Sequence, residues 1–250
     1  MKLEERLWVA ADYDPRKEGD IAGVLEKVHE LAKALQGTGV TLKVNSILRA
    51  WGYGLIREIH AFGLDVCADL KLTDISNTSE LDAVMLAMFR PRYMTMMCAS
   101  SLAAIEKVKK AVGASTQVIG VTLLTDISPA ECSDLYDMTS LEMAIRFAKH
   151  AKKTGCLDGL VASALEVPRL RILLDDLSGL TLTTPGIRPA WAPVQNDDQK
   201  RVATIAEAIQ SGADRVVLGR PITQAKDPRE AVERTLKEIE AALAAIAQKA

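Results

Sequence analysis

The sequence predicts an α/β protein built on one closed, parallel sheet, and three observations predict it. Short apolar segments alternate with longer amphipathic segments along all 250 residues, and each kind occurs eight times. The connections between them are short. No linker, low-complexity run or internal repeat divides the chain. Eight strands alternating with eight helices form the (β/α)8 arrangement, the TIM barrel, so we expect a single domain over residues 1–250.

Composition and charge narrow the class of protein. Hydrophobic residues make up 48% of the chain and charged residues 26%, which favours a globular core over disorder or membrane spans. A net charge of -2 gives no reason to expect nucleic acid or a membrane surface as a partner. The four cysteines form no C-x-x-C pair, so they predict neither a zinc site nor a redox motif. Residues 1–6 lack the form of a signal peptide, and we expect a cytoplasmic protein.

The expected elements follow from these apolar patterns. Each strand is a short apolar run that ends at a polar residue or at glycine or proline, and each helix has apolar residues at a spacing of three and four. The strands are expected at 7–12, 40–44, 62–68, 93–98, 117–124, 158–163, 180–184 and 215–219. The helices are expected at 20–35, 47–62, 79–88, 101–112, 140–153, 165–174, 199–211 and from 228 onward, with Pro129 in a loop.

The third strand runs into the most informative stretch, D-L-K-L-T-D-I-S-N-T at 69–78. Side chains two apart on a strand share a face, so Asp69 and Lys71 should point the same way. Asp74 follows in the turn. An ammonium between two carboxylates at a strand-to-helix corner suits the chemistry of barrel enzymes. The alternative at this point is a structural ion pair.

Polar residues also follow the other expected strands, and in a barrel these ends meet at one mouth. Glycine allows close backbone approach after the eighth strand, and the arginine beside it can fork two hydrogen bonds to phosphate. We therefore expect a phosphorylated small molecule as the ligand. The residues are Asp12, Lys43, Thr125, Ser163, Arg188, Gln199, Gly219 and Arg220.

These stretches together resemble the orotidine 5'-phosphate decarboxylase family. The motif at 69–78 is similar to the family's active-site motif, although D-x-K-x-x-D also occurs in sugar-phosphate decarboxylases and hexulose-phosphate synthases. T-P-G-I-R-P at 184–189 and D-D-Q-K-R at 197–201 favour the orotidylate branch. The chain departs from the family's usual pattern at Asn45, Ser76, Met97, Asp126 and Leu165, which bears on base recognition.

The resemblance implies a role for each matching residue. Asp12 and Lys43 would hold the ribose hydroxyls, and Asp69, Lys71 and Asp74 would form the charged array at the reacting carbon, with Lys71 as proton donor. No metal or organic cofactor is implied. The family's dimer would bring Asp74, Ile75 and Thr78 into the partner subunit's site. The remaining substrate-binding residues would be Thr125 and Gln199 near the pyrimidine and phosphate, Arg188, Gly219 and Arg220 on the phosphate side, and Ser163 and Pro185.

Two other hypotheses stay open on the sequence alone. One is a Mg²⁺-dependent sugar-phosphate decarboxylase or aldolase of the same superfamily. The other is a non-catalytic barrel that binds nucleotide. The chain retains Lys43, Asp69, Lys71 and Asp74, which favours the decarboxylase.

Overall fold

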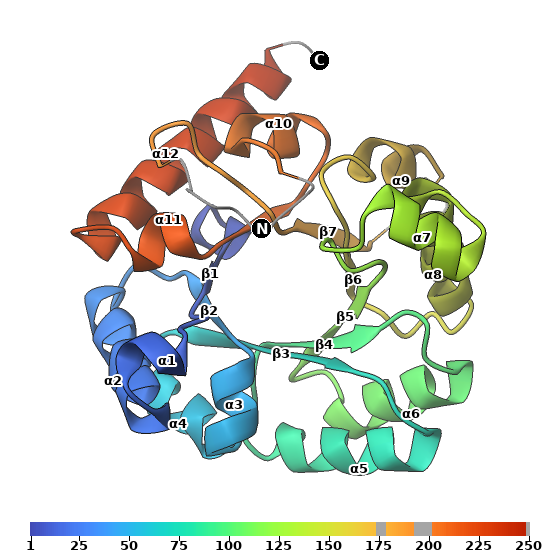
Figure 1. Cartoon of the computed structure of the whole chain (residues 1–250), viewed down its shortest axis with the longest axis horizontal. Coiled ribbons are helices and arrows are strands. Elements are labelled where there is room, and N and C mark those ends of the chain that lie inside the picture. The colour runs from blue at the N-terminus through green and yellow to red at the C-terminus, as the bar shows by residue number, and fades with distance from the viewer. Residues whose placement is uncertain (174–178, 193–201, 249–250) are drawn as a thin grey trace.

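The computed structural model of the chain describes residues 1–173, 179–192 and 202–248. Eight parallel strands close into a barrel in the order β1 to β8, and each strand pairs with its neighbours in the sequence. Helices form a ring around the strands (Figure 1). The expected (β/α)8 barrel is confirmed.

Most strand residues are buried, as expected where both faces of a parallel sheet are covered. The strands are β1 (Leu7–Ala10), β2 (Thr41–Val44), β3 (Asp65–Leu72), β4 (Tyr93–Met97), β5 (Gln117–Val121), β6 (Gly159–Val161), β7 (Thr181–Thr184) and β8 (Arg215–Leu218). The helices of the described ranges are α1 (Pro15–Glu18), α2 (Ile21–Ala34), α3 (Ser46–Trp51), α4 (Gly54–His60), α5 (Ser76–Ala87), α6 (Leu102–Val112), α7 (Pro129–Tyr136), α8 (Ser140–Lys152), α9 (Val167–Leu173), α10 (Ile205–Gln210), α11 (Arg220–Thr223) and α12 (Pro228–Ala247).

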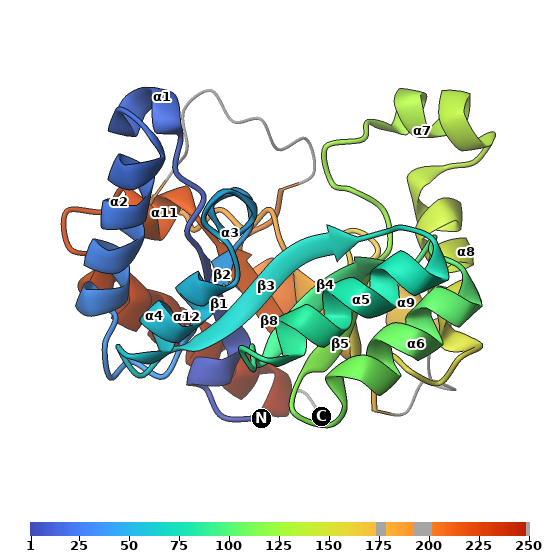
Figure 2. The ribbon, with the colours of Figure 1, turned by 90° about the horizontal axis from the view of Figure 1, so that it is seen from below.

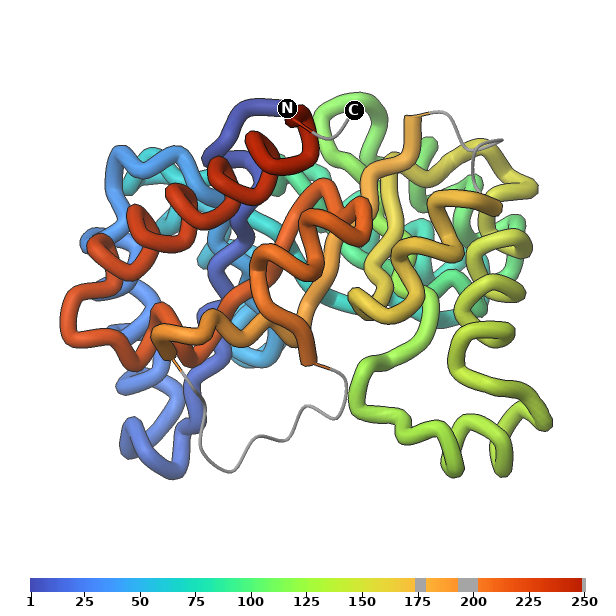
Figure 3. The backbone as a smooth tube through the Cα atoms, turned by 90° about the horizontal axis from the view of Figure 1, so that it is seen from above, coloured from blue at the N-terminus to red at the C-terminus, as the bar shows by residue number. Residues whose placement is uncertain are grey.

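Strand alternation divides the core into two layers. One face of each strand joins the large cluster that packs against the helices, and Val66, Ala68 and Leu70 of β3 belong to it. The other face fills the barrel interior with a small cluster that includes Trp8, Tyr93 and Val217. On the outer surface α10 and α12 pack side by side (Figure 3). Any polar side chain in the barrel interior therefore lies next to this apolar cluster.

Several boundaries differ from the expected ones for local reasons. The expected helix at 47–62 is divided into α3 and α4, because Gly52 lies between them at a φ of 96°. The segment around Pro129 was expected as a loop, but it forms α7, which begins with a capping box between Ser128 and Glu131. Residues 202–204 precede α10, so the expected helix start at 199 is wrong for the described part. Thr204 caps that helix instead.

The carboxyl ends of the strands and the two ends of the described chain lie at opposite ends of the barrel. The carboxyl ends of the strands open toward the edge at which α1 and α7 project (Figure 2). The amino terminus and the end of α12 lie at the opposite edge. Among the helices of the described ranges, none has the length and apolar character needed to cross a bilayer.

Close packing between strands makes a testable prediction at Gly120 of β5. A Cβ there would lie 2.6 Å from Cys98 Sγ and 2.7 Å from Leu157 Cδ1. Gly120→Ala should therefore lower the free energy of unfolding by about 1–3 kcal/mol in urea denaturation. The matched control is Gly54→Ala at the start of α4, where a Cβ meets nothing within 4 Å. Equal stability of the two variants would contradict this account.

Candidate active site

An irregularity in β3 builds the centre of the site. Ala68 pairs with Met94 of β4, and the next pair joins Leu72 to Met96. The chain therefore advances four residues along β3 while it advances two along β4. The two extra residues form a β-bulge, and Lys71 lies in it at a φ of 48°. Bulges re-aim side chains next to functional sites. The sequence predicted the end of this strand at 68, and the structure extends it to Leu72 because the bulge accommodates the motif.

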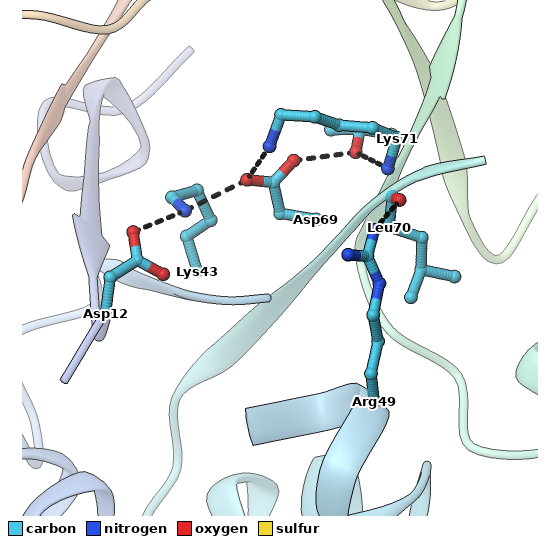
Figure 4. A network of polar contacts seen from close by, with 7 residues as sticks. Asp12, Lys43, Arg49, Asp69, Leu70 and Lys71 are labelled. Atoms are coloured by element: carbon cyan, nitrogen blue, oxygen red, sulfur yellow. Dashed lines mark hydrogen bonds and ion pairs between the residues drawn. The ribbon is translucent and has the colours of Figure 1, made fainter. Parts of the chain in front are cut away.

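Asp69 is the common partner of two ammonium groups (Figure 4). Its Oδ2 accepts hydrogen bonds from Lys43 Nζ at 2.9 Å and from Lys71 Nζ at 2.8 Å. Lys43 Nζ also donates to Asp12 Oδ2 at 3.0 Å. Strands β1, β2 and β3 thus supply a chain of alternating charges at their carboxyl ends. Asp69 and Lys71 meet as their spacing predicted.

Burial makes these charges depend on one another. The side chains of Asp69 and Lys43 are 7% and 11% exposed, whereas that of Lys71 is 33% exposed. Burial alone would raise the pKa of Asp69, but the ammonium groups of Lys43 and Lys71 hold it well below its usual range. Burial alone would lower the pKa of Lys43, yet Asp69 and Asp12 raise it above its ordinary value. These two buried groups therefore stay ionised, and Lys71 presents an ammonium at the open side.

Two further residues hold the bulge, and the sequence pattern identified neither. Thr95 of β4 donates from Oγ1 to Asp69 Oδ1 at 2.8 Å and accepts from the Lys71 backbone N at 2.9 Å. Arg49 of α3 donates to the Leu70 carbonyl oxygen (Figure 4). A threonine between methionines in a buried strand was the available signal for Thr95. Nothing in the sequence pattern marks Arg49.

The three residues expected to reach the partner subunit follow the bulge. Asp74 is exposed, and its Oδ1 accepts a hydrogen bond from the Ile75 backbone N at 2.6 Å. No ion pair within 4 Å joins it to Lys71 in the described part of the chain. Ile75 is 71% exposed, and Thr78 lies in the first turn of α5. Within one chain the Lys71 ammonium therefore pairs with Asp69 and not with Asp74, so the expected position between two carboxylates is not formed there.

The other expected residues lie after their strands, around the same mouth. Ser163 follows β6 and is buried, and its backbone N donates to Glu166 Oε2 at 3.0 Å. Backbone bonds from Arg188 N to Ala203 O and from Ala203 N to Gly186 O bring together the two described ends of the segment after β7. Gln199 lies outside the described residues. Thr125 follows β5, Pro185 follows β7, and Gly219 and Arg220 lie where β8 passes into α11.

Asp12 and Asp69 pair with lysine ammonium groups. In ranges 1–173, 179–192 and 202–248, no group of three His, Cys, Asp or Glu side chains is placed to hold a metal ion. The paired array can bind polar hydroxyls and present a proton donor to a bound anion.

Acids and lysines at the carboxyl ends of barrel strands define this chain as a (β/α)8 enzyme. A family model described as "Orotidine 5'-phosphate decarboxylase / HUMPS family" matches residues 5–235. The orotidine 5'-phosphate decarboxylase of Geobacter metallireducens is 37% identical over 201 residues, 77% of this chain and 82% of the relative. That of a Bradyrhizobium species is 37% identical over 232 residues, 91% of each chain.

Solved structures show the same likeness. The crystal structure of the Lactobacillus acidophilus orotidine 5'-phosphate decarboxylase superposes with a TM-score of 0.70 at 28% identity. The match covers 94% of this chain and 99% of that one. The chain belongs to the orotidine 5'-phosphate decarboxylase / HUMPS family.

The buried array predicts how stability depends on pH. The folded chain holds the pKa of Asp69 below its ordinary value of 3.8, so the unfolded chain binds the proton first as the pH falls. The carboxylate thus adds stability above about pH 4, and this contribution is lost at lower pH. Asp69→Asn should cost about 3 kcal/mol at pH 7, with a smaller difference from the parent at pH 2.5.

Urea denaturation across this pH range measures the effect. Asp134→Asn, at an exposed position on α7, is the control. If Asp69→Asn and Asp134→Asn changed stability equally at pH 7, the buried array would not have the proposed strength.

Proposed function

We propose that this chain decarboxylates orotidine 5'-monophosphate to UMP and CO2, a step of de novo pyrimidine biosynthesis. The observation that carries the proposal is the chain of contacts Asp12–Lys43–Asp69–Lys71 at the barrel mouth. The names of its relatives support it, because enzymes 34–37% identical over most of the chain are orotidine 5'-phosphate decarboxylases. The whole chain acts as one catalytic domain in this proposal.

The chemistry requires a cation at the reacting carbon. When the bond between the ring carbon and the carboxylate breaks, its electron pair remains on the ring, with no adjacent carbonyl to take the charge. The Lys71 ammonium stabilises this carbanion electrostatically and then donates a proton to it. Asp69, which anchors Lys71 at 2.8 Å, faces the leaving carboxylate and favours its departure. Water then returns a proton to Lys71.

The remaining residues bind the parts of the substrate that do not react. Asp12 and Lys43 accept and donate hydrogen bonds at the ribose hydroxyls, with Thr125 and Ser163 toward the pyrimidine. Pro185, Arg188, Gln199, Gly219 and Arg220 form the phosphate side. The Gly186–Ala203 backbone pairing supports this part of the proposal, because it fixes the base of the segment expected to cover the phosphate. Binding energy from the phosphate thereby lowers the barrier at the ring.

The direct test mixes the protein with orotidine 5'-monophosphate and excess EDTA and follows loss of the orotate ultraviolet band. We expect rapid loss with UMP as product. Lys71→Ala should lower kcat by at least about 10³-fold, because one group supplies both charge stabilisation and the proton. Its affinity for UMP should stay within about tenfold of the parent.

Lys237→Ala is the matched control, since this lysine is exposed on α12. It should turn over substrate like the parent. If the parent fails to decarboxylate orotidine 5'-monophosphate but acts on a sugar phosphate with Mg²⁺, the protein is a Mg²⁺-dependent sugar-phosphate decarboxylase or aldolase instead. Nucleotide binding without any turnover would indicate the non-catalytic barrel.

We also propose a homodimer in which Asp74, Ile75 and Thr78 enter the partner subunit's site. An apolar surface on α5 supports it. Leu81, Val84, Met85 and Met88 recur at helical spacing on the exposed face, while Ser79, Ala83 and Leu86 are buried. These four residues are a candidate interface of the kind that two copies of a chain bury against each other, and Ile75 before the helix is exposed as well.

The state of the cysteines indicates the cellular compartment in which the protein works. All four are free, and Cys67, Cys98 and Cys132 are buried. Free thiols suit a reducing compartment, and we place the reaction in the cytoplasm.

The double variant Leu81→Glu/Met88→Glu tests the dimer. Two carboxylates on the apolar surface should convert the protein to monomers in sedimentation velocity and remove most activity, because each site would lose its partner residues. Ile172→Glu, an equally exposed apolar position on α9, should leave both unchanged. A parent protein that sediments as a monomer with full activity would rule out composite sites.

A further inference from the structure

A cavity lies at the opposite end of the barrel from the lysine and aspartate array. It has a volume of about 570 Å³, within the range of small-molecule sites. Gln117, Thr181 and Arg215, the first residues of β5, β7 and β8, line it. It therefore opens at the amino-terminal ends of the strands. The apolar cluster of Trp8, Tyr93 and Val217 in the barrel interior lies between it and the proposed active site.

Arg215 is the unusual residue of this cavity. It is only 3% exposed, and its guanidinium carbon lies 4.9 Å from the centre of the Tyr93 ring and 5.8 Å from that of Trp8. Nη1 donates to Thr181 Oγ1 at 2.6 Å, and Nη2 is 3.5 Å from the Tyr93 hydroxyl. Nε is buried and has no hydrogen-bond partner. Within the described ranges no carboxylate forms an ion pair with this guanidinium.

The acids around the cavity are already matched by other cations. Glu5 accepts from Arg92 Nη2 at 2.7 Å, and Arg92 pairs with Asp65 as well. Asp158 pairs with Lys109 at 2.6 Å. The positive charge of Arg215 is thus left without a neutralising carboxylate at a site shielded from water, which is destabilising unless an anion neutralises it.

We propose that this cavity binds a small molecule through an oxyanion group, a carboxylate or a phosphate, that pairs with Arg215. The planar guanidinium has five donors and uses two of them in the bonds described above, so it can form a fork toward two oxygens of such a group. Gln117 lies at the cavity wall, where its amide can donate a further hydrogen bond. The site is separate from the proposed nucleotide site and does not depend on the function proposed for it.

Trp8 provides a spectroscopic test, because its ring flanks Arg215 in the barrel interior. Trp51→Phe/Trp191→Phe leaves Trp8 as the sole tryptophan. Inorganic phosphate and succinate are titrated into this protein against chloride at equal ionic strength. We expect a saturable change in Trp8 fluorescence with at least one of them. The anion that gives the response identifies the oxyanion class.

Three variants locate the binding. Gln117→Glu places a negative charge in the cavity wall and should weaken binding at least tenfold. Gln36→Glu makes the same charge change at an exposed turn outside the cavity and should bind like the parent. Arg215→Gln should abolish binding, and if it fails to fold, the comparison of Gln117→Glu with Gln36→Glu still decides. The proposal is overturned if neither anion responds beyond chloride, or if these two variants titrate alike.

Discussion

The buried Asp69 carboxylate determines how the site is built. A lone charge at this depth would be strongly destabilising, and three donors offset that effect: Lys43 on β2, Lys71 on the same strand and Thr95 on β4. Each donor is held by the register of its own strand. The ammonium at the mouth is therefore positioned by the closed sheet, because a shift of either neighbouring strand would leave a buried charge unpaired.

Much of the fold was predictable because it rests on periodicity. Alternation of short apolar runs and amphipathic helices gave eight strands in the right order, and side chains at the strand ends met around one mouth. The division of α3 from α4 at Gly52 and the capped helix α7 depend on local backbone conformation, which helical periodicity does not report. The contacts of Thr95 and Arg49 arise from the bulge, and pairing between distant strands is invisible in a single sequence.

The two ends of the barrel handle charge in opposite ways. At the carboxyl ends, two lysines and two aspartates neutralise one another around the buried Lys43–Asp69 pair, and the Lys71 ammonium lies at the opening. At the amino-terminal ends, aromatic rings and a hydroxyl surround Arg215 while nearby acids pair elsewhere. A self-neutralised array keeps its geometry when no ligand is bound, whereas an isolated guanidinium gains most when an anion arrives.

The number of residues that the bulge adds to β3 decides which way the residues beyond it face. The bulge adds two residues, an even number, so inward and outward faces stay in phase on both sides of it: Ala68 and Leu72 both remain in the outer core. A single extra residue would have turned Leu72 into the interior. Two is the smallest insertion that lengthens this strand without inverting the residues beyond it, so the irregularity that houses Lys71 leaves the remainder of the barrel in register.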